Sequence, residues 1–156
     1  MAIPLIAYET TAHVRNACLC LHTQRAARAL ARRFDEALRP AGLTNGQFSL
    51  LMALNRPEPA TVSEVAVLLG ADRTTLTAAL KPLVRRGLAQ ISADEGDSRV
   101  RRIAPTADGR AALAAALPLW TRTHAALEAE LGQADPERLR RDLRSLSISA
   151  ERETLP

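Results

Sequence analysis

Apolar side chains recur at spacings near three and four between His13 and Leu38, as they do on one face of an α-helix. Pro40 and Gly42 follow and end the pattern. The sequence therefore predicts a helix over about residues 13–38, preceded by a loosely ordered arm over residues 1–12. The stripe consists of Val14, Ala17, Leu21, Ala27, Leu30, Phe34 and Leu38, and arginines occupy most of the positions between them.

Two capping-box sequences mark the starts of two shorter helices. The first runs from Thr44 to Gln47 and the second from Thr61 to Glu64. Two prolines in the connector over residues 56–59 exclude helix between them. We expect the first helix to bury Phe48, Leu50, Leu51 and Leu54, and the second to bury Val62, Val65, Ala66 and Leu69 before ending at a left-handed Gly70.

A third short helix follows at once, with Asp72 as its cap and Gly87 as its end. Pro82 lies inside it and predicts a bend, because proline removes one helical hydrogen bond at a cost of about 3 kcal/mol. The buried face consists of Leu76, Leu80 and Leu83, and the exposed side carries Arg73, Thr74, Thr77, Ala78 and Lys81. Two helices that meet at a Gly-Ala turn predict a helix-turn-helix, whose second helix enters a DNA major groove.

Residues 88–93 and 99–104 are candidate strands, although their alternation is imperfect. The segment between them, 94–98, has the composition of a turn. A basic hairpin directly after a helix-turn-helix predicts a wing. We therefore expect a winged helix-turn-helix over about residues 44–104.

The C-terminal third predicts two further helices. Thr106 is placed to cap an Ala- and Leu-rich helix that runs to about Leu131 and is kinked at Pro118. Asp135 and Pro136 begin a last helix, which ends near residue 149. These helices and the first one are more apolar than a winged helix-turn-helix can cover, so the pattern predicts a two-fold dimer. Such a dimer places two recognition helices roughly 34 Å apart, about one DNA turn.

Composition and charge support this interpretation. Hydrophobic residues make up 47% of the chain but aromatic residues only 3%, which favours packed helices over a β-sandwich. Much of the formal net charge of +4 lies between residues 72 and 102, where basic residues outnumber acidic ones by seven to four. A basic helix-turn-helix favours a polyanionic partner. The basic residues of this segment are Arg73, Lys81, Arg85, Arg86, Arg99, Arg101 and Arg102.

The N-terminal segment shows no targeting signal. It lacks a basic start and a long apolar run, so we expect no secretion signal. No apolar run approaches the roughly 20 residues that a membrane-spanning helix needs. The sequence therefore predicts a cytoplasmic protein.

Together these segments resemble the MarR family of dimeric transcriptional regulators over about residues 13–149. The resemblance is carried by GLTNGQFSLL (42–51), DRTTLTAALKPLVRRGL (72–88), DEGDSRVRRI (94–103) and PTADGR (105–110). It implies one domain over residues 1–156 that is mainly α with a small β-hairpin wing. The helices over about 13–40 and 106–149 would form the dimerisation region.

The resemblance further implies a homodimeric repressor of a pseudo-palindromic DNA site, released by a small phenolic or aromatic ligand. That ligand would bind where the dimerisation helices meet the DNA-binding lobe. Arg99, in the family's Asp-x-Arg wing signature, would enter a minor groove, and Asp97 would orient it or a neighbouring arginine. Arg101 and Arg102 carry the remaining charge of the wing, and Arg101 is a further expected DNA contact. On the recognition helix, we expect Arg73 and Thr77 to read base edges, and Thr74, Thr75 and Lys81 to hold phosphates. The chain departs from the family at Ala78 and Ser98, where basic residues are common.

The two cysteines leave an alternative open. In some relatives a cysteine near the start of the first helix senses peroxides, and Cys20 falls at that position. The tyrosines that would assist the thiol are absent near Gln24, Phe34 and Asn45. A small buried apolar residue is the other interpretation of each cysteine.

The remaining classes of function are less well supported. Of His13, Cys18, Cys20 and His22, only Cys18 and His22 share a helix face. Two ligands are too few for a structural zinc site, so we expect no metal and no cofactor. The sequence contains no nucleophile constellation and no Gly-rich phosphate loop, so an enzyme is not expected. A winged helix used only for protein contacts is a further alternative, against which the basic wing argues.

Overall fold

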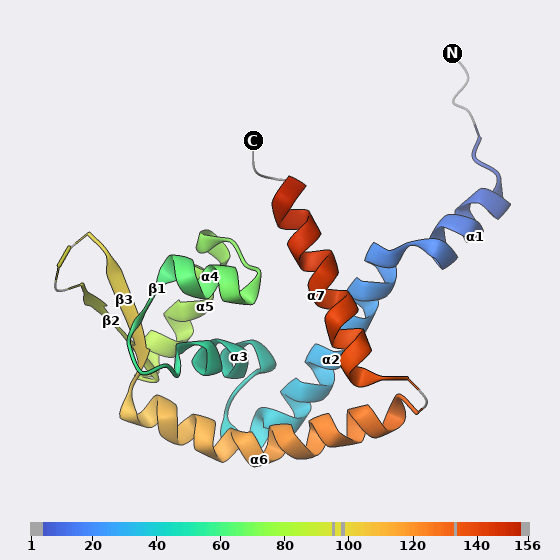
Figure 1. Ribbon diagram of the computed structural model, residues 1–156. Coiled ribbons are helices and arrows are strands. Elements are labelled where there is room, and N and C mark those ends of the chain that lie inside the picture. The colour runs from blue at the N-terminus through green and yellow to red at the C-terminus, as the bar shows by residue number, and fades with distance from the viewer. Residues whose placement is uncertain (1–4, 95, 98, 133, 154–156) are drawn as a thin grey trace.

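The computed structural model describes residues 5–94, 96–97, 99–132 and 134–153, and the side chains as far as residue 147. Glu95 and Ser98 of the predicted wing lie outside the described residues. The elements, in chain order (Figure 1), are α1 (Tyr8–Ala17), α2 (Leu19–Leu38), the 3-10 turn η1 (Arg39–Ala41), α3 (Asn45–Leu54), β1 (Ala60–Thr61), α4 (Val62–Leu69), α5 (Arg73–Arg85), β2 (Ala89–Ala93), β3 (Arg101–Pro105), α6 (Ala107–Glu130) and α7 (Pro136–Glu153).

The predicted fold class, mainly α with a small wing, is confirmed. Both capping boxes form, because the Thr44 and Thr61 hydroxyl oxygens accept the N–H groups of Gln47 and Glu64 at 3.2 Å. Gly70 ends α4 with φ 59°, a left-handed conformation that glycine adopts without steric strain. The local signals therefore place the helix-turn-helix correctly.

The N-terminal segment differs from the prediction. Residues 8–12 are helical rather than a loose arm, and the expected single helix over 13–38 is broken at Cys18, whose backbone is extended (φ −71°, ψ 105°). The Cys18 Sγ accepts the N–H of Leu21 at 3.4 Å and so replaces a helical bond at the break. The apolar repeat continues through this point and therefore does not reveal it. Of the predicted stripe only Phe34 and Leu38 are buried, and Val14 and Leu30 are exposed.

The sheet has three antiparallel strands in the order β1-β3-β2, one more than predicted. Ala60 pairs with Ile103 on one side of β3, and Ile91 pairs with Ile103 on the other. A strand as short as β1 has no periodicity to detect. The second predicted strand begins at Arg101 rather than Arg99, because Val100 and Asp97 close a turn by a backbone hydrogen bond of 2.9 Å.

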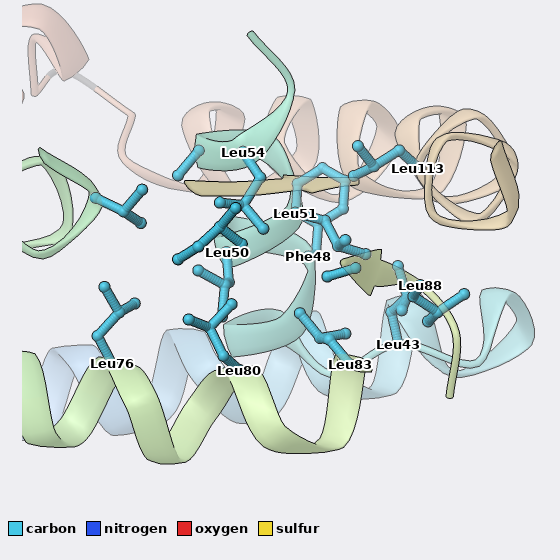
Figure 2. Packing of buried hydrophobic residues seen from close by; sticks show 14 of the residues in the cluster. Leu43, Phe48, Leu50, Leu51, Leu54, Leu76, Leu80, Leu83, Leu88 and Leu113 are labelled. Atoms are coloured by element: carbon cyan, nitrogen blue, oxygen red, sulfur yellow. The ribbon is translucent and has the colours of Figure 1, made fainter. Parts of the chain in front are cut away.

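The hydrophobic core lies in the winged-helix lobe (Figure 2). Leu76, Leu80 and Leu83 of α5 face the buried leucines of α3, as the spacing predicts. Each fully buried leucine stabilises the fold by about 1.5–3 kcal/mol. Leu69 was predicted to be buried but is partly exposed, because the left-handed turn at Gly70 ends α4 beside it.

The start of α6 is held tightly against this lobe. The Thr106 side chain caps α6 and donates to the Gly87 carbonyl at 2.5 Å, and its N–H donates to the Leu88 carbonyl at 3.1 Å. A Cβ atom at Gly109 would lie 1.9 Å from that Leu88 oxygen. Only glycine fits there, so the direction of α6 follows from the end of α5.

Helices α1 and α7 lie outside the lobe: α1 continues outward from the far end of α2, and α7 rises from the far end of α6 (Figure 1). No residue of α1 is buried, and Leu139, Leu143 and Leu146 of α7 are 43%, 43% and 51% exposed. Within the described residues, neither helix makes more than marginal backbone contact with other elements. Among all the residues that the structure describes, no helix is both long and apolar enough to cross a membrane.

Candidate nucleic-acid interface

The outward face of α5 is the first part of the site. Burial of the leucine face turns five positions to solvent together, and all five are exposed in the structure: Arg73, Thr74, Thr77, Ala78 and Lys81. Neither Arg73 nor Lys81 makes a side-chain hydrogen bond or ion pair within the described part of the chain. Both cations therefore remain available to a ligand.

The beginning of α5 is organised by Asp72. Its Oδ1 accepts the N–H of Thr75 at 2.8 Å, and its Oδ2 accepts the Thr75 hydroxyl at 2.6 Å. The side-chain and backbone hydrogen bonds from Thr75 lower the pKa of the Asp72 carboxyl. Thr75 has thus already donated its only hydroxyl proton, and it donates it to a carboxylate.

Thr77 is also turned back on its own helix. Its hydroxyl donates to the Arg73 carbonyl at 2.7 Å, one turn earlier. With the hydroxyl proton used in this way, the methyl group is the part of the side chain that remains available to a ligand. The centre of the exposed face is consequently less polar than its composition suggests.

The wing is braced at its base by a contact that the sequence analysis did not anticipate. The Nε of Arg102 donates to Asp94 Oδ2 at 2.5 Å, and its Nη1 donates to the Pro59 carbonyl at 3.2 Å. The other Asp94 oxygen accepts the N–H groups of Gly96 and Asp97 at 2.9 and 3.2 Å. Arg102, whose charge was counted towards the wing's polyanion affinity, therefore joins β3, the wing loop and the connector before β1.

The tip of the wing carries Arg99, which is 94% exposed. Asp97 Oδ1 accepts the Arg99 backbone N–H at 3.0 Å but lies 3.9 Å from its Nε. Asp97 thus orders the backbone of the Asp-x-Arg signature and leaves the guanidinium largely free. Arg101 is exposed as well.

An open hollow of about 640 Å³ separates α5 from the wing. Its lining is largely apolar, and Lys81, Arg85 and Arg101 contribute cations to it. Arg85 was not among the predicted site residues, although it lies four positions after Lys81 and so on the same face. Its neighbour Arg86 is held elsewhere, by the Gln47 side chain at 3.1 Å and the Gly42 carbonyl at 2.9 Å.

The cysteines lie far from this surface in the chain, at the break between α1 and α2. Cys20 is exposed and its Sγ accepts a hydrogen bond from Gln24 at 3.2 Å, so it is not a buried apolar residue. Cys18 is half-buried, and both thiols are free. Among the described residues, no three side chains of His, Cys, Asp or Glu come together as a possible metal site.

The brace at the base of the wing has a measurable signature. Arg102 and the two loop N–H groups lower the pKa of Asp94, the arginine contributing most. We expect Arg102→Met to raise that pKa towards the ordinary aspartate value of about 3.9, as followed by NMR titration of the Asp94 carboxyl carbon. The exposed Arg101→Met serves as the control. Equal Asp94 pKa values in the two variants would show that Arg102 does not hold the carboxylate.

The same pair predicts how stability depends on pH. Because the pKa of Asp94 is lower in the folded protein than in the unfolded chain, the ionised carboxylate adds to the free energy of unfolding. This contribution is fully present at pH values above the pKa that Asp94 has in the unfolded chain. The contribution is lost as the pH falls through the folded value. The Arg102→Met protein should therefore lose less stability on acidification than the Arg101→Met protein.

Comparisons with known proteins agree with this geometry. The model of the MarR family matches residues 41–99. The transcriptional regulator MosR of Mycobacterium tuberculosis, solved in complex with DNA, is 45% identical; the alignment covers 88% of this chain and 99% of MosR, with a TM-score of 0.79. A probable transcriptional regulator from Pseudomonas aeruginosa is 27% identical over 84% of this chain and 98% of its own, with a TM-score of 0.75.

A more distant structure shares the fold. CouR from Rhodococcus jostii RHA1, solved with p-coumaroyl-CoA, is 22% identical over 90% of this chain and 96% of its own, with a TM-score of 0.68. No match was found among curated proteins. Three findings agree: the match to the family model, the 45% identity to MosR over 99% of the MosR chain, and the observed helix-turn-helix with its wing. The chain belongs to the MarR family of DNA-binding transcriptional regulators.

Proposed function

We propose that this protein is a homodimeric repressor that binds a pseudo-palindromic DNA site. The observation that carries the proposal is the pairing of two exposed elements on one lobe. Helix α5 buries its leucines and presents Arg73, Thr77 and Lys81, and the neighbouring wing presents Arg99. Each α5 would enter a major groove and each wing the adjacent minor groove.

The contacts divide into two kinds. Arg73 and Thr77 would meet base edges, whereas Thr74, Lys81 and Arg101 would hold phosphates and set the register. We add Arg85, because the DNA backbone between the two grooves would pass over the hollow where Lys81 and Arg85 both lie. A phosphate contact by Thr75 would require its hydroxyl to leave Asp72, so we no longer give Thr75 that role.

The dimer is supported by α1 and α7, which are packed little against the rest of the described chain. The apolar stripe of α7 and the exposed apolar side chains Tyr8 and Val14 of α1 would each cost free energy if they stayed in water. A two-fold axis lets the same surfaces cover one another, and the resulting interface is closed. The helices α1, α2, α6 and α7 would form the dimerisation region.

Regulation by a small ligand is the third part of the proposal. CouR, the distant relative solved with p-coumaroyl-CoA, binds a molecule with a phenolic acyl group. At 22% identity this likeness concerns the fold, so a phenolic or aromatic effector is a proposal for this chain. Such a ligand would act by favouring a dimer whose two α5 helices are wrongly spaced for one face of DNA.

The division between base and phosphate contacts can be tested directly. We expect Arg99→Ala to weaken binding to a selected site and to random duplex DNA alike, because a cation lost from the wing affects all sequences. We expect Thr77→Ala to reduce the preference for the selected site, with a smaller effect on random DNA. Competition gel shifts at one salt concentration measure, for each variant, the ratio of its affinities for the selected site and for random DNA. The division fails if the two variants lose sequence preference equally, and the proposed function fails if the wild type binds no duplex in a salt-dependent way.

The proposed dimer surface is tested by placing a charge in it. Leu143→Glu should raise the dimer dissociation constant at least about tenfold, because an unpaired carboxylate would be buried against the partner. Arg141→Glu, on the opposite face of α7, is the matched control and should dissociate like the wild type. Sedimentation equilibrium of all three proteins gives the constants. A monomeric wild type, or equal constants for the two variants, would contradict the dimer.

Thiol-based peroxide sensing remains a second candidate, favoured by where the cysteines lie. Cys20 is exposed, and Cys18 two residues earlier caps α2 at the break in the first helix. A peroxide would oxidise the Cys20 thiol to a sulfenic acid with loss of water, and attack by the Cys18 thiol would release a second water and form a disulfide. The Cys18 cap would then be lost within the proposed dimerisation region.

This candidate makes a separate prediction. After mild peroxide treatment the wild type should release DNA, with a sulfenate or disulfide at Cys20 detected by mass spectrometry. Cys20→Ser should keep its DNA under the same treatment. Retention of DNA by an oxidised wild type would exclude the thiols as the sensor. The proposal that the protein is a DNA-binding repressor would be unaffected by that result.

A further inference from the structure

The centre of the exposed α5 face consists of two side chains that offer methyl groups. Thr77 has a single hydroxyl proton and donates it to the Arg73 carbonyl at 2.7 Å, so that proton is not available to a base acceptor. Ala78, the next residue, has only a methyl group, and both residues are exposed. Two adjacent methyl-bearing positions therefore occupy the centre of the face that would meet base edges under the proposed function.

The surroundings of these two residues are apolar on one side and charged at both ends. Thr77 and Ala78 line the hollow between α5 and the wing, together with Pro82, Val84 and Ile91. Arg73 lies one turn before Thr77 and Lys81 one turn after it, and both are exposed. The cations can hold the DNA at the two ends of this stretch, while Thr77 and Ala78 between them have no side-chain proton free to donate.

The chemistry of the major groove limits what such a surface can recognise. Base edges there present hydrogen-bond donors and acceptors, and the apolar group among them is the C5-methyl of thymine. We propose that Thr77 and Ala78 read thymine C5-methyl groups in each half-site. This inference rests on the proposed function, since it assumes that α5 occupies a major groove.

The competing role for Thr77 is polar readout, in which its oxygen would accept a hydrogen bond from a base amino group, or its hydroxyl would leave the Arg73 carbonyl and donate to a base. Two near-isosteric substitutions separate the roles. Thr77→Val keeps a methyl group in the same place and removes the hydroxyl, whereas Thr77→Ser keeps the hydroxyl and removes the methyl. Thr74→Val, on the same helix but in the phosphate role, controls for a general effect of losing a hydroxyl.

The experiment begins with a site selected by the full-length protein from a random duplex library. Each thymine of one half-site is then replaced by uracil, which differs only in lacking the methyl group, and binding is measured by fluorescence anisotropy. We expect at least one position where uracil weakens binding about fourfold, the value of one buried methyl group. In Thr77→Val the ratio of the affinities for the thymine and uracil sites should stay about fourfold, and in Thr77→Ser it should fall close to one.

A second substitution asks whether the methyl group itself is recognised. At the sensitive position, a 5-methylcytosine–guanine pair should bind about fourfold more tightly than a cytosine–guanine pair. Equal binding of those two pairs would overturn the inference, as would a half-site without any uracil-sensitive thymine, or a uracil ratio that Thr77→Ser leaves unchanged. Failure to select any sequence would instead contradict the proposed function and the inference with it.

Discussion

The arrangement of the DNA-binding lobe depends on the burial of one leucine face. Leu76, Leu80 and Leu83 pack α5 against α3, and this packing determines the rotation of α5 about its own axis. Because side chains on a helix have fixed angular positions, burying that face also decides which residues face outward. The exposed face of α5 is thus a consequence of the core, and a change in core packing would rotate or shift it.

Two contacts transmit the position of α5 to the rest of the chain. At the end of α5, the Leu88 carbonyl receives the Thr106 N–H and leaves room only for Gly109, so α6 starts in one direction. At the wing, Arg102 joins β3 to the Asp94 loop and to the connector before β1. Specific contacts therefore join α5 to the long helix α6, and the wing to the connector before β1. Under the proposed function, a change in the dimerisation region would reach the DNA surface through α6, whose start is fixed against the end of α5.

The exposed face of α5 has polar groups at its two ends and apolar groups at its centre. Thr75 and Thr77 both use their hydroxyl protons within the chain, the first to bond to the capping carboxylate of Asp72 and the second to bond to a carbonyl one turn back. Free charge remains on Arg73 and Lys81 at the two ends, and on Arg99 in the wing. A composition that looks uniformly polar therefore yields charged ends and an apolar centre, a difference that matters for how a sequence is read.

The sequence by itself determined where the helices of the winged helix-turn-helix begin and end. Capping at Thr44, Thr61, Asp72 and Thr106 and the left-handed Gly70 were predictable, because their bonds span only a few positions. The tertiary structure decided what depends on residues far apart: the strand β1, which exists only through pairing with β3, and the contact of Arg102 with Pro59 across 43 positions. The break at Cys18 and the hydroxyl bonds of Thr75 and Thr77 are local but depend on rotamers and backbone angles that residue type leaves open. Periodicity locates a buried face, whereas only a folded chain shows which exposed groups are still free.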